Sequence, residues 1–376
     1  MSLRVDALFQ PITLGKLELK NRLAMAPMTR NRSPKGIPGD DVAAYYRRRA
    51  EADIGLIITE GTPPPHKAAV GYPNVPLFFG EEPLAGWKRV VDEVHAAGGK
   101  IFPQLWHVGS IRQAGINPGG DLPGYGPSAI VHPNHAKINP NKQAQPPHEM
   151  TQVDIDECVQ AFATAAKSAQ DLGFDGVEIH GAHGYLIDQF FWETTNQRTD
   201  KYGGSFENRL NFAIELIAAT RAAVGPDYPI CFRFSQWKQG DYNWKIAQNA
   251  EELDRFLTPL SHAGVDIFHA STRRFWEPEF EGSDLNLAGW TRKITGKPTI
   301  TVGSVGLDTD FLTTFKGVTA KAAGIEQLVE RLEKGEFDLV AVGRALLSDP
   351  AWASKVHEGR SDEIVDFNPA CLAKLI

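Results

Sequence analysis

The sequence predicts a single (β/α)8 TIM barrel, and three observations support this prediction. Eight short, mostly apolar segments recur along the 376 residues, and segments with helical periodicity lie between them. Strands that are apolar on both faces are typical of parallel sheets covered by helices. Eight alternations of strand and helix close such a sheet into a barrel. The competing open, doubly wound sheet would carry a G-x-G-x-x-G turn after an early strand, and the sequence has none.

The predicted strands end in polar residues or glycine, and helices follow several of them. The strands are predicted over residues 22–26, 54–60, 100–105, 176–180, 230–234, 266–270, 299–302 and 339–342. The clearest helices are predicted over residues 84–97, 154–172, 208–224, 250–263 and 325–334. Thr151 is placed to cap the second of these helices, and Gly173 is placed to end it.

Two inserts interrupt the alternation. Residues 109–147, after the third strand, are rich in Pro, Gly, Asn and His, and we expect this long excursion to cover the barrel mouth. Residues 236–247 carry three aromatic side chains, which predicts an ordered, packed loop. No repeat or low-complexity tract divides the chain, so we expect residues 1–376 to form a single domain.

Composition argues against several classes of protein. The chain is 42% hydrophobic and 23% charged, as is usual for globular proteins. A net charge of −7 without a basic stripe argues against a nucleic-acid partner. No apolar stretch reaches the ~20 residues of a membrane span, and the first residues lack the pattern of a secretory signal. Cys158, Cys231 and Cys371 are too scattered for a disulfide framework, so we expect a reducing, cytoplasmic location.

Polar residues and glycines follow the predicted strands, and a barrel gathers these strand ends at one mouth. They are residues 27–30, 60–62, 104–107, 178–185, 233, 303–304 and 343–344. This set suits a phosphorylated heterocycle, because glycine amides approach a phosphate closely and Arg344 can pair with it in a forked geometry. Gln104 can make paired amide contacts with a ring edge. Arg233 lies in an apolar segment and needs a negative partner when buried, which an anionic ring or a structural salt bridge would each supply.

His180, His183 and Tyr185 form the most distinctive group, and three interpretations are open. The histidines could ligate zinc, although they lie on a turn without an H-E-x-x-H partner. They could be core histidines bonded to the backbone. We favour a pair of donors aimed at a substrate oxygen, which would stabilise an enolate. Tyr185, protonated at neutral pH because a phenol has a pKa near ~10, would then supply the proton.

Several short motifs follow one another in a fixed order. They are LFQP from Leu8, LKNR from Leu19, APMT from Ala26, HGAHGYLIDQF from His180, NQRTDKYGGS from Asn196, ENR from Glu207 and GR from Gly343. In this combination the chain resembles the Old Yellow Enzyme family of FMN-dependent ene-reductases. The resemblance implies an FMN-dependent NAD(P)H oxidoreductase with tightly bound, non-covalent FMN and with NADPH or NADH as a transient reductant. Its substrates would be small α,β-unsaturated carbonyl, imide or nitro compounds.

The resemblance also implies roles for individual residues. The residues implied to contact the flavin ring are Pro27, Met28, Thr29, Gly61, Gln104, His180 and Arg233. Those implied to contact the phosphate are Gly303, Ser304, Gly343 and Arg344. His180 and His183 would bind the substrate oxygen, Tyr185 would protonate the α-carbon after hydride reaches the β-carbon, and no metal is expected. The substrate pocket would be lined by Tyr72, Trp106, Phe275 and Trp276. Two alternatives to an ene-reductase stay open, namely a nitroester or nitroaromatic reductase and a non-catalytic flavin-binding protein. The oligomeric state, monomer or homodimer, also stays open.

Overall fold

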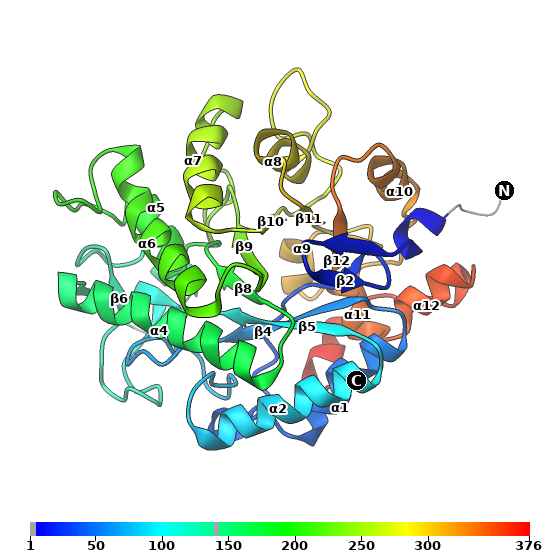
Figure 1. Ribbon diagram of the computed structural model, residues 1–376, viewed down its shortest axis with the longest axis horizontal. Coiled ribbons are helices and arrows are strands. Elements are labelled where there is room, and N and C mark those ends of the chain that lie inside the picture. The colour runs from blue at the N-terminus through cyan, green and yellow to red at the C-terminus, as the bar shows by residue number, and fades with distance from the viewer. Residues whose placement is uncertain (1–4, 139–142) are drawn as a thin grey trace.

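The computed structural model describes residues 5–138 and 143–376 and places a closed parallel barrel at the centre of a ring of helices (Figure 1). The barrel strands are β3 (Leu23–Met25), β4 (Leu56–Thr62), β5 (Lys100–Leu105), β8 (Val177–His180), β9 (Ile230–Phe234), β10 (Ile267–Ser271), β11 (Thr299–Val302) and β12 (Leu339–Val342). β12 pairs with β3 and closes the barrel. The predicted (β/α)8 fold is confirmed, and β5, β9, β11 and β12 have the predicted bounds.

Helices cover the outside of the barrel. The longer ones are α1 (Asp40–Glu51), α2 (Glu81–Ala96), α4 (Gln152–Leu172), α6 (Phe206–Val224), α7 (Ala250–Ala263), α8 (Leu287–Thr295) and α10 (Glu326–Glu333). The shorter ones are α3 (His135–Ile138), α5 (Leu186–Phe191), α9 (Phe311–Phe315), α11 (Ala345–Ser348) and α12 (Trp352–His357). Sequence reasoning missed α8, whose Gly, Trp and Thr residues are weak helix formers. Asn286 starts this helix by accepting the N–H of Gly289 at 2.9 Å.

The ends of α4 confirm the predicted boundary residues. The Thr151 hydroxyl accepts the N–H of Asp154 at 3.2 Å, and the Asp154 carboxylate accepts the N–H of Thr151 at 2.9 Å. This reciprocal pair satisfies two amide groups at the start of the helix. Gly173 ends α4 with a φ of 90°, a left-handed conformation that favours glycine.

A two-stranded hairpin closes one end of the barrel. β1 (Ile12–Leu14) and β2 (Leu17–Leu19) pair antiparallel just before β3, so they lie at the amino ends of the barrel strands. Leu14, Leu17 and Leu19 join a buried apolar cluster with the interior side chains of the strands. The amino end is therefore filled by apolar side chains, and the carboxyl end is left for polar chemistry.

The excursion after β5 supports neighbouring loops at the barrel mouth. It contains β6 (Tyr125–Gly126), and β7 (His148–Glu149) follows it, while residues 139–142 lie outside the described residues. The Asn134 amide donates to the Gln239 carbonyl at 2.6 Å, which ties the excursion to the segment after β9. None of its described residues lines the cavity at the mouth.

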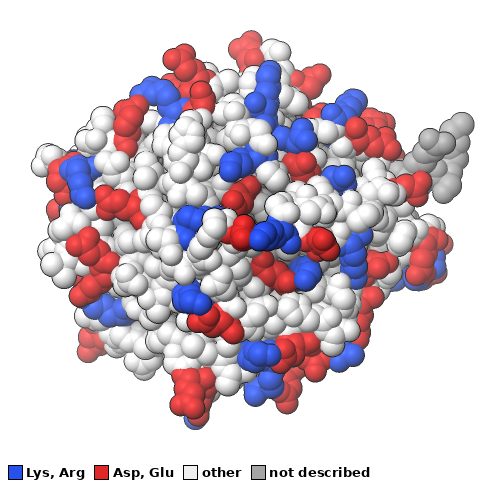
Figure 2. Space-filling view, viewed as in Figure 1, with Lys and Arg blue, Asp and Glu red and all other residues white. Residues whose placement is uncertain are grey.

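The surface mixes charges of both signs. On the face drawn in Figure 2, Lys and Arg side chains lie among Asp and Glu side chains. Among the described helices, none is long and apolar enough to cross a membrane.

Candidate active site

A cavity of about 520 Å³ lies at the carboxyl ends of the barrel strands. Most residues predicted for the site line it. These are Pro27, Met28, Thr29, Tyr72, Gln104, Trp106, His180, His183, Tyr185, Arg233, Gly303, Ser304, Gly343 and Arg344. Residues more than 300 positions apart in sequence thus meet in one space, as the strand-end rule predicts for a barrel.

Three predicted site residues do not line this cavity. Phe275 is 4% exposed and packs into the core between barrel and helices, and Trp276 packs against the same core. The Phe275 carbonyl accepts the Asn286 amide at 2.7 Å, which anchors the segment under α8. Phe275 and Trp276, which we predicted to line the substrate pocket, are therefore not among the residues that line this cavity. Gly61 lies behind Trp106, where a Cβ atom would come within 2.4 Å of the indole ring.

Other residues line the cavity without having been predicted. They are Asn31, Trp237, Ser271, Thr272, Arg273, Phe311, Thr314, Leu347, Phe367 and Leu372, together with a few aliphatic neighbours. Ser271 is the last residue of β10, so the strand-end rule could have found it. Phe367 and Leu372 come from the C-terminal segment, whose position depends on contacts that no local pattern reports.

Arg233 places a buried positive charge in the cavity. Its side chain comes from β9, is 8% exposed, and donates from Nη2 to the Ser271 hydroxyl at 3.2 Å. Its Nε has no hydrogen-bond partner among the described residues. Burial lowers the pKa of Arg233, and Glu178 partly opposes this. Because an unpaired buried cation is costly, the geometry favours an anionic group in the cavity over a structural salt bridge.

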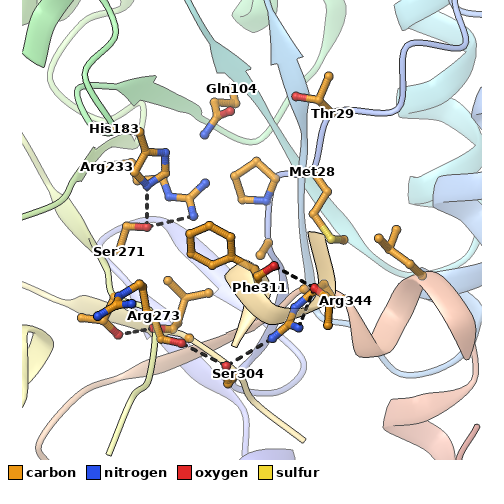
Figure 3. Close-up of a pocket in the computed structure, with 18 of the residues that line it drawn as sticks. Met28, Thr29, Gln104, His183, Arg233, Ser271, Arg273, Ser304, Phe311 and Arg344 are labelled. Carbon is orange, nitrogen blue, oxygen red and sulfur yellow. Dashed lines mark hydrogen bonds between the residues drawn. The ribbon is translucent and has the colours of Figure 1, made fainter. Parts of the chain in front are cut away.

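The amide of Gln104 is held in one orientation by a buried carboxylate. Gln104 donates from Nε2 to Glu178 at 2.8 Å, and His269 contacts the other carboxylate oxygen at 2.6 Å. Burial alone raises the pKa of Glu178, but His269, Arg233 and Gln104 outweigh it and lower the pKa. The ionised carboxylate can only accept, so it fixes the amide nitrogen on its side. Gln104 then offers its oxygen and its second N–H to a group bound in the cavity that it lines (Figure 3).

The residues that follow β11 and β12 form a polar cradle in the wall of the cavity. Gly303 has a φ of 136°, and a Cβ atom there would come within 2.8 Å of the Thr272 carbonyl, so only glycine fits. Arg344 donates to the Ser304 hydroxyl at 3.2 Å (Figure 3). It also donates to the Thr309 carbonyl at 2.6 Å. Burial lowers the pKa of Arg344 to about 10, so the guanidinium is charged at neutral pH. Its contacts within the cradle are neutral oxygens, and the arrangement suits a phosphate.

His180 and His183 are neutral donors at the opposite side of the cavity. Burial, followed by the charge of Arg233, lowers the pKa of His180 to about 3 and also lowers that of His183. The His180 Nδ1 accepts the N–H of Ala182 at 3.3 Å, so Nε2 carries the proton. His183 Nε2 lies 2.8 Å from the Ser271 hydroxyl, and this hydroxyl accepts from Arg233 (Figure 3). The hydroxyl can therefore donate its own proton to Nε2, which leaves the proton of the neutral His183 ring on Nδ1.

Tyr185 is a protonated phenol beside this pair. Burial raises its pKa well above the usual value, and its hydrogen bond with Tyr72 raises it further. The ring packs edge-on against Trp106 and His180, with centroid distances of 5.0 and 5.1 Å. Tyr185 therefore holds its phenolic proton inside an apolar, aromatic pocket.

No third metal-binding side chain joins His180 and His183 among the described residues. Their rings lie 5.1 Å apart and nearly perpendicular. Within residues 5–138 and 143–376, no three His, Cys, Asp or Glu side chains converge in a way that could hold a metal ion.

Comparisons with known proteins agree with this geometry. Residues 7–363 match the model of the NADH:flavin oxidoreductase / NADH oxidase family. The chain is 34% identical to 12-oxophytodienoate reductase 2 of Arabidopsis thaliana, covering 91% of this chain and 86% of that protein. It is 35% identical to the NADH oxidase of Thermoanaerobacter brockii over 97% of this chain, but it spans only 53% of that protein.

Solved structures extend the likeness to three dimensions. Morphinone reductase in complex with tetrahydroNAD superposes with a TM-score of 0.80 at 29% identity, covering 97% of this chain and 94% of that one. Since a family model spans nearly the whole chain and the fold agrees, the resemblance inferred from the motifs is confirmed. The chain belongs to the NADH:flavin oxidoreductase family, that of the Old Yellow Enzymes, and is an FMN-dependent oxidoreductase that uses NAD(P)H.

Proposed function

We propose that this protein is an ene-reductase that reduces the activated C=C bond of small α,β-unsaturated carbonyl, imide or nitro compounds. The observation that supports this most directly is the convergence of two neutral histidines and a protonated tyrosine in one aromatic cavity. His180 and His183 carry lowered pKa values, and Tyr185 a raised one. Residues 1–376 would act as one FMN-binding unit, with NADPH or NADH as the reductant.

The residues of the cavity fit FMN. Gln104 and Arg233 would contact the polar edge of the ring, as would the Thr29 hydroxyl, and the unpartnered Nε of Arg233 would gain an acceptor there. Gly303, Ser304, Gly343 and Arg344 would hold the phosphate. Bound FMN would supply the hydride that adds to the β-carbon of the substrate.

The chain itself would supply position, polarisation and a proton. The N–H donors of His180 and His183 would bind the carbonyl or nitro oxygen and stabilise the negative charge that develops on it. Because both histidines are neutral, they can polarise this oxygen without giving up their own protons. Tyr185 would donate its phenolic proton to the α-carbon. Tyr72 and Trp106, whose rings stack 5.5 Å apart, would exclude water from a flat conjugated substrate.

The test is the visible spectrum of the purified protein before and after anaerobic addition of NADPH, followed by turnover of 2-cyclohexen-1-one. We expect a yellow protein that NADPH bleaches and the enone re-oxidises. A colourless protein would overturn the proposal. A yellow protein that turns over no enone would indicate a non-catalytic flavin protein, and faster turnover of a nitroester would indicate a nitroester reductase.

Replacing Tyr185 by Phe tests the proton donor separately. The variant should retain FMN and its reduction by NADPH, and enone turnover should fall by roughly 10²-fold or more, as for loss of a general acid. Equal effects on flavin reduction and enone turnover would contradict this role.

Changing His180 and His183 together to Ala should weaken phenol binding and slow enone reduction without loss of FMN.

A further inference from the structure

The turn that carries His183 and Tyr185 has a strained backbone. His183 has a φ of 65° and Gly184 a φ of 78°, so two consecutive residues are left-handed. For a residue with a Cβ atom this conformation is unfavourable, so neighbouring groups must hold it. The position of the His183 ring and of the Tyr185 phenol therefore depends on what anchors this turn.

Two segments supply the anchors. From α5, Asp188 accepts the Gly184 N–H at 2.7 Å, and Gln189 donates to the Gly184 carbonyl at 2.7 Å. From the segment after β9, the Gln239 N–H donates to the His183 carbonyl at 3.2 Å. The turn is thus held between α5 and the segment after β9.

A buried ion pair joins these two segments. The Lys238 ammonium contacts the Asp188 carboxylate, and the two side chains are 0% and 1% exposed. Asp188 uses one oxygen for Gly184 and the other for Lys238. Lys238 Nζ also lies 4.2 Å from the centroid of the Trp244 ring, a cation–π contact. Burial raises the pKa of Asp188 and lowers that of Lys238, and each partner opposes the shift of the other.

The same segment places an aromatic wall on the donor histidine. Trp237, the neighbour of Lys238, stacks on the His183 ring with a centroid distance of 4.4 Å and an interplanar angle of 15°. Trp237 also lines the cavity. The ion pair therefore connects the helix that anchors the His183–Gly184 turn with the segment that stacks on the His183 ring.

Stability does not explain this pair. Desolvating two charges offsets most of their attraction, and well-packed apolar residues of the same size are often at least as stable. A buried ion pair that links α5 to the segment after β9, beside a binding cavity, instead favours one relative arrangement of these two segments. We propose that Lys238, through Asp188, is a positioning residue that holds His183, Tyr185 and Trp237 in their substrate-binding arrangement. This inference rests on the proposed function.

The experiment compares three variants of the FMN-loaded protein. The single variant Lys238→Met keeps the side-chain length but removes the charge. The double variant combines Lys238→Met with Asp188→Asn, so that no unpaired carboxylate is left buried. Lys88→Met is the control, because Lys88 forms an exposed pair with Asp92 on α2. For each variant we would measure the melting temperature, FMN content, affinity for 4-hydroxybenzaldehyde by calorimetry, and kcat and KM for 2-cyclohexen-1-one.

Lys238→Met should weaken 4-hydroxybenzaldehyde binding and reduce kcat/KM by roughly 10- to 100-fold, as for a displacement of about 1 Å in a binding site. FMN content should not change, because the residues proposed to bind the cofactor come from the barrel strands and the turns directly after them, outside the segment after β9. The double variant should recover the melting temperature but neither the affinity nor kcat/KM. Lys88→Met should match the parent in every measurement.

Two results would overturn the inference. One is unchanged phenol affinity and kcat/KM in Lys238→Met. The other is recovery of both in the double variant, which would make the pair purely structural. If Lys238→Met does not fold, the charge-balanced double variant still provides the test. If the parent binds 4-hydroxybenzaldehyde but reduces no enone, the proposed function fails, while the phenol affinities still test Lys238.

Discussion

At the amino end of the barrel, Leu14, Leu17 and Leu19 of the β1–β2 hairpin fill the interior with apolar side chains. Toward the carboxyl end, the barrel strands β8 and β9 carry Glu178 and Arg233, both buried. The first arrangement stabilises the fold, because apolar area leaves water. The second costs stability unless a bound group completes it, since a buried charge needs a partner. The side chains that stabilise the fold and the charged side chains suited to bind a ligand therefore lie at opposite ends of the barrel.

The largest expected effect comes from Arg233→Met at the polar end. Losing the charge partner should weaken FMN binding by about 2–5 kcal/mol, as for truncation of one member of a buried charge pair. The FMN-free protein should melt no lower than the parent, because the substitution removes an incompletely paired buried cation. Flavin fluorescence titration and calorimetry measure the two quantities. Unchanged FMN affinity, or a lower melting temperature without FMN, would contradict the contrast between the two ends.

Leu17→Ala probes the apolar end. Leu17 is 3% exposed within the hairpin cluster, so truncation should lower the free energy of unfolding by about 2–5 kcal/mol. FMN content and KM for 2-cyclohexen-1-one should match the parent, because the hairpin lies at the other end of the strands. Urea unfolding gives the first quantity. A raised KM would show that the two ends are coupled.

Glu178→Gln should have a smaller, electrostatic effect. Glu178 is ionised and lies 2.8 Å from the Gln104 amide, so it opposes further negative charge in the cavity. Its neutralisation should raise the midpoint potential of bound FMN by about 30 mV for every 1.4 kcal/mol of lost repulsion. Dye-equilibrated potentiometry measures this. A lower potential would mean that Glu178 affects the midpoint potential of FMN mainly by orienting Gln104, and less by its charge.

The smallest expected effect concerns pH. The pKa of His180 is lowered to about 3, so this histidine gains a proton only as pH falls toward that value and is neutral from pH 5 to 8. KM for 2-cyclohexen-1-one should therefore show no histidine step in this window. Glu60, whose pKa burial raises to about 7, accepts the N–H of the cavity residue Asn31 at 3.1 Å. A step near pH 6–7 that persists in Glu60→Gln would contradict a neutral His180.

The strand-borne part of the site was predictable, and much of the loop-borne part was not. Gln104 and Arg233 lie on or at the end of short apolar segments, and barrel geometry brings such positions together. Phe275 and Trp276 also follow a barrel strand closely, yet Asn286 and α8 draw them into the outer core. The strand-end rule fails there because a loop can turn away within a few residues.

The segment after β9 shows what local sequence could not reveal. Its aromatic residues predicted an ordered loop, and Lys238 gave no sign of burial, since lysine is usually exposed. Only the tertiary structure places it against Asp188, fifty residues earlier. Trp237 becomes a cavity wall for the same reason, by stacking on His183.

By itself, the sequence determined the eight strands, the helix boundaries at Thr151 and Gly173, and the family to which the chain belongs. These follow from periodicity, capping and motif order, which act over neighbouring residues. The tertiary structure alone decided which loop residues reach the cavity, the orientation of Gln104 and the ion pair of Lys238. It also decided that the Arg233 Nε has no hydrogen-bond partner among the described residues. Those features depend on burial and on contacts between distant segments, and burial sets the energy of a charge far more strongly than its neighbours in sequence do.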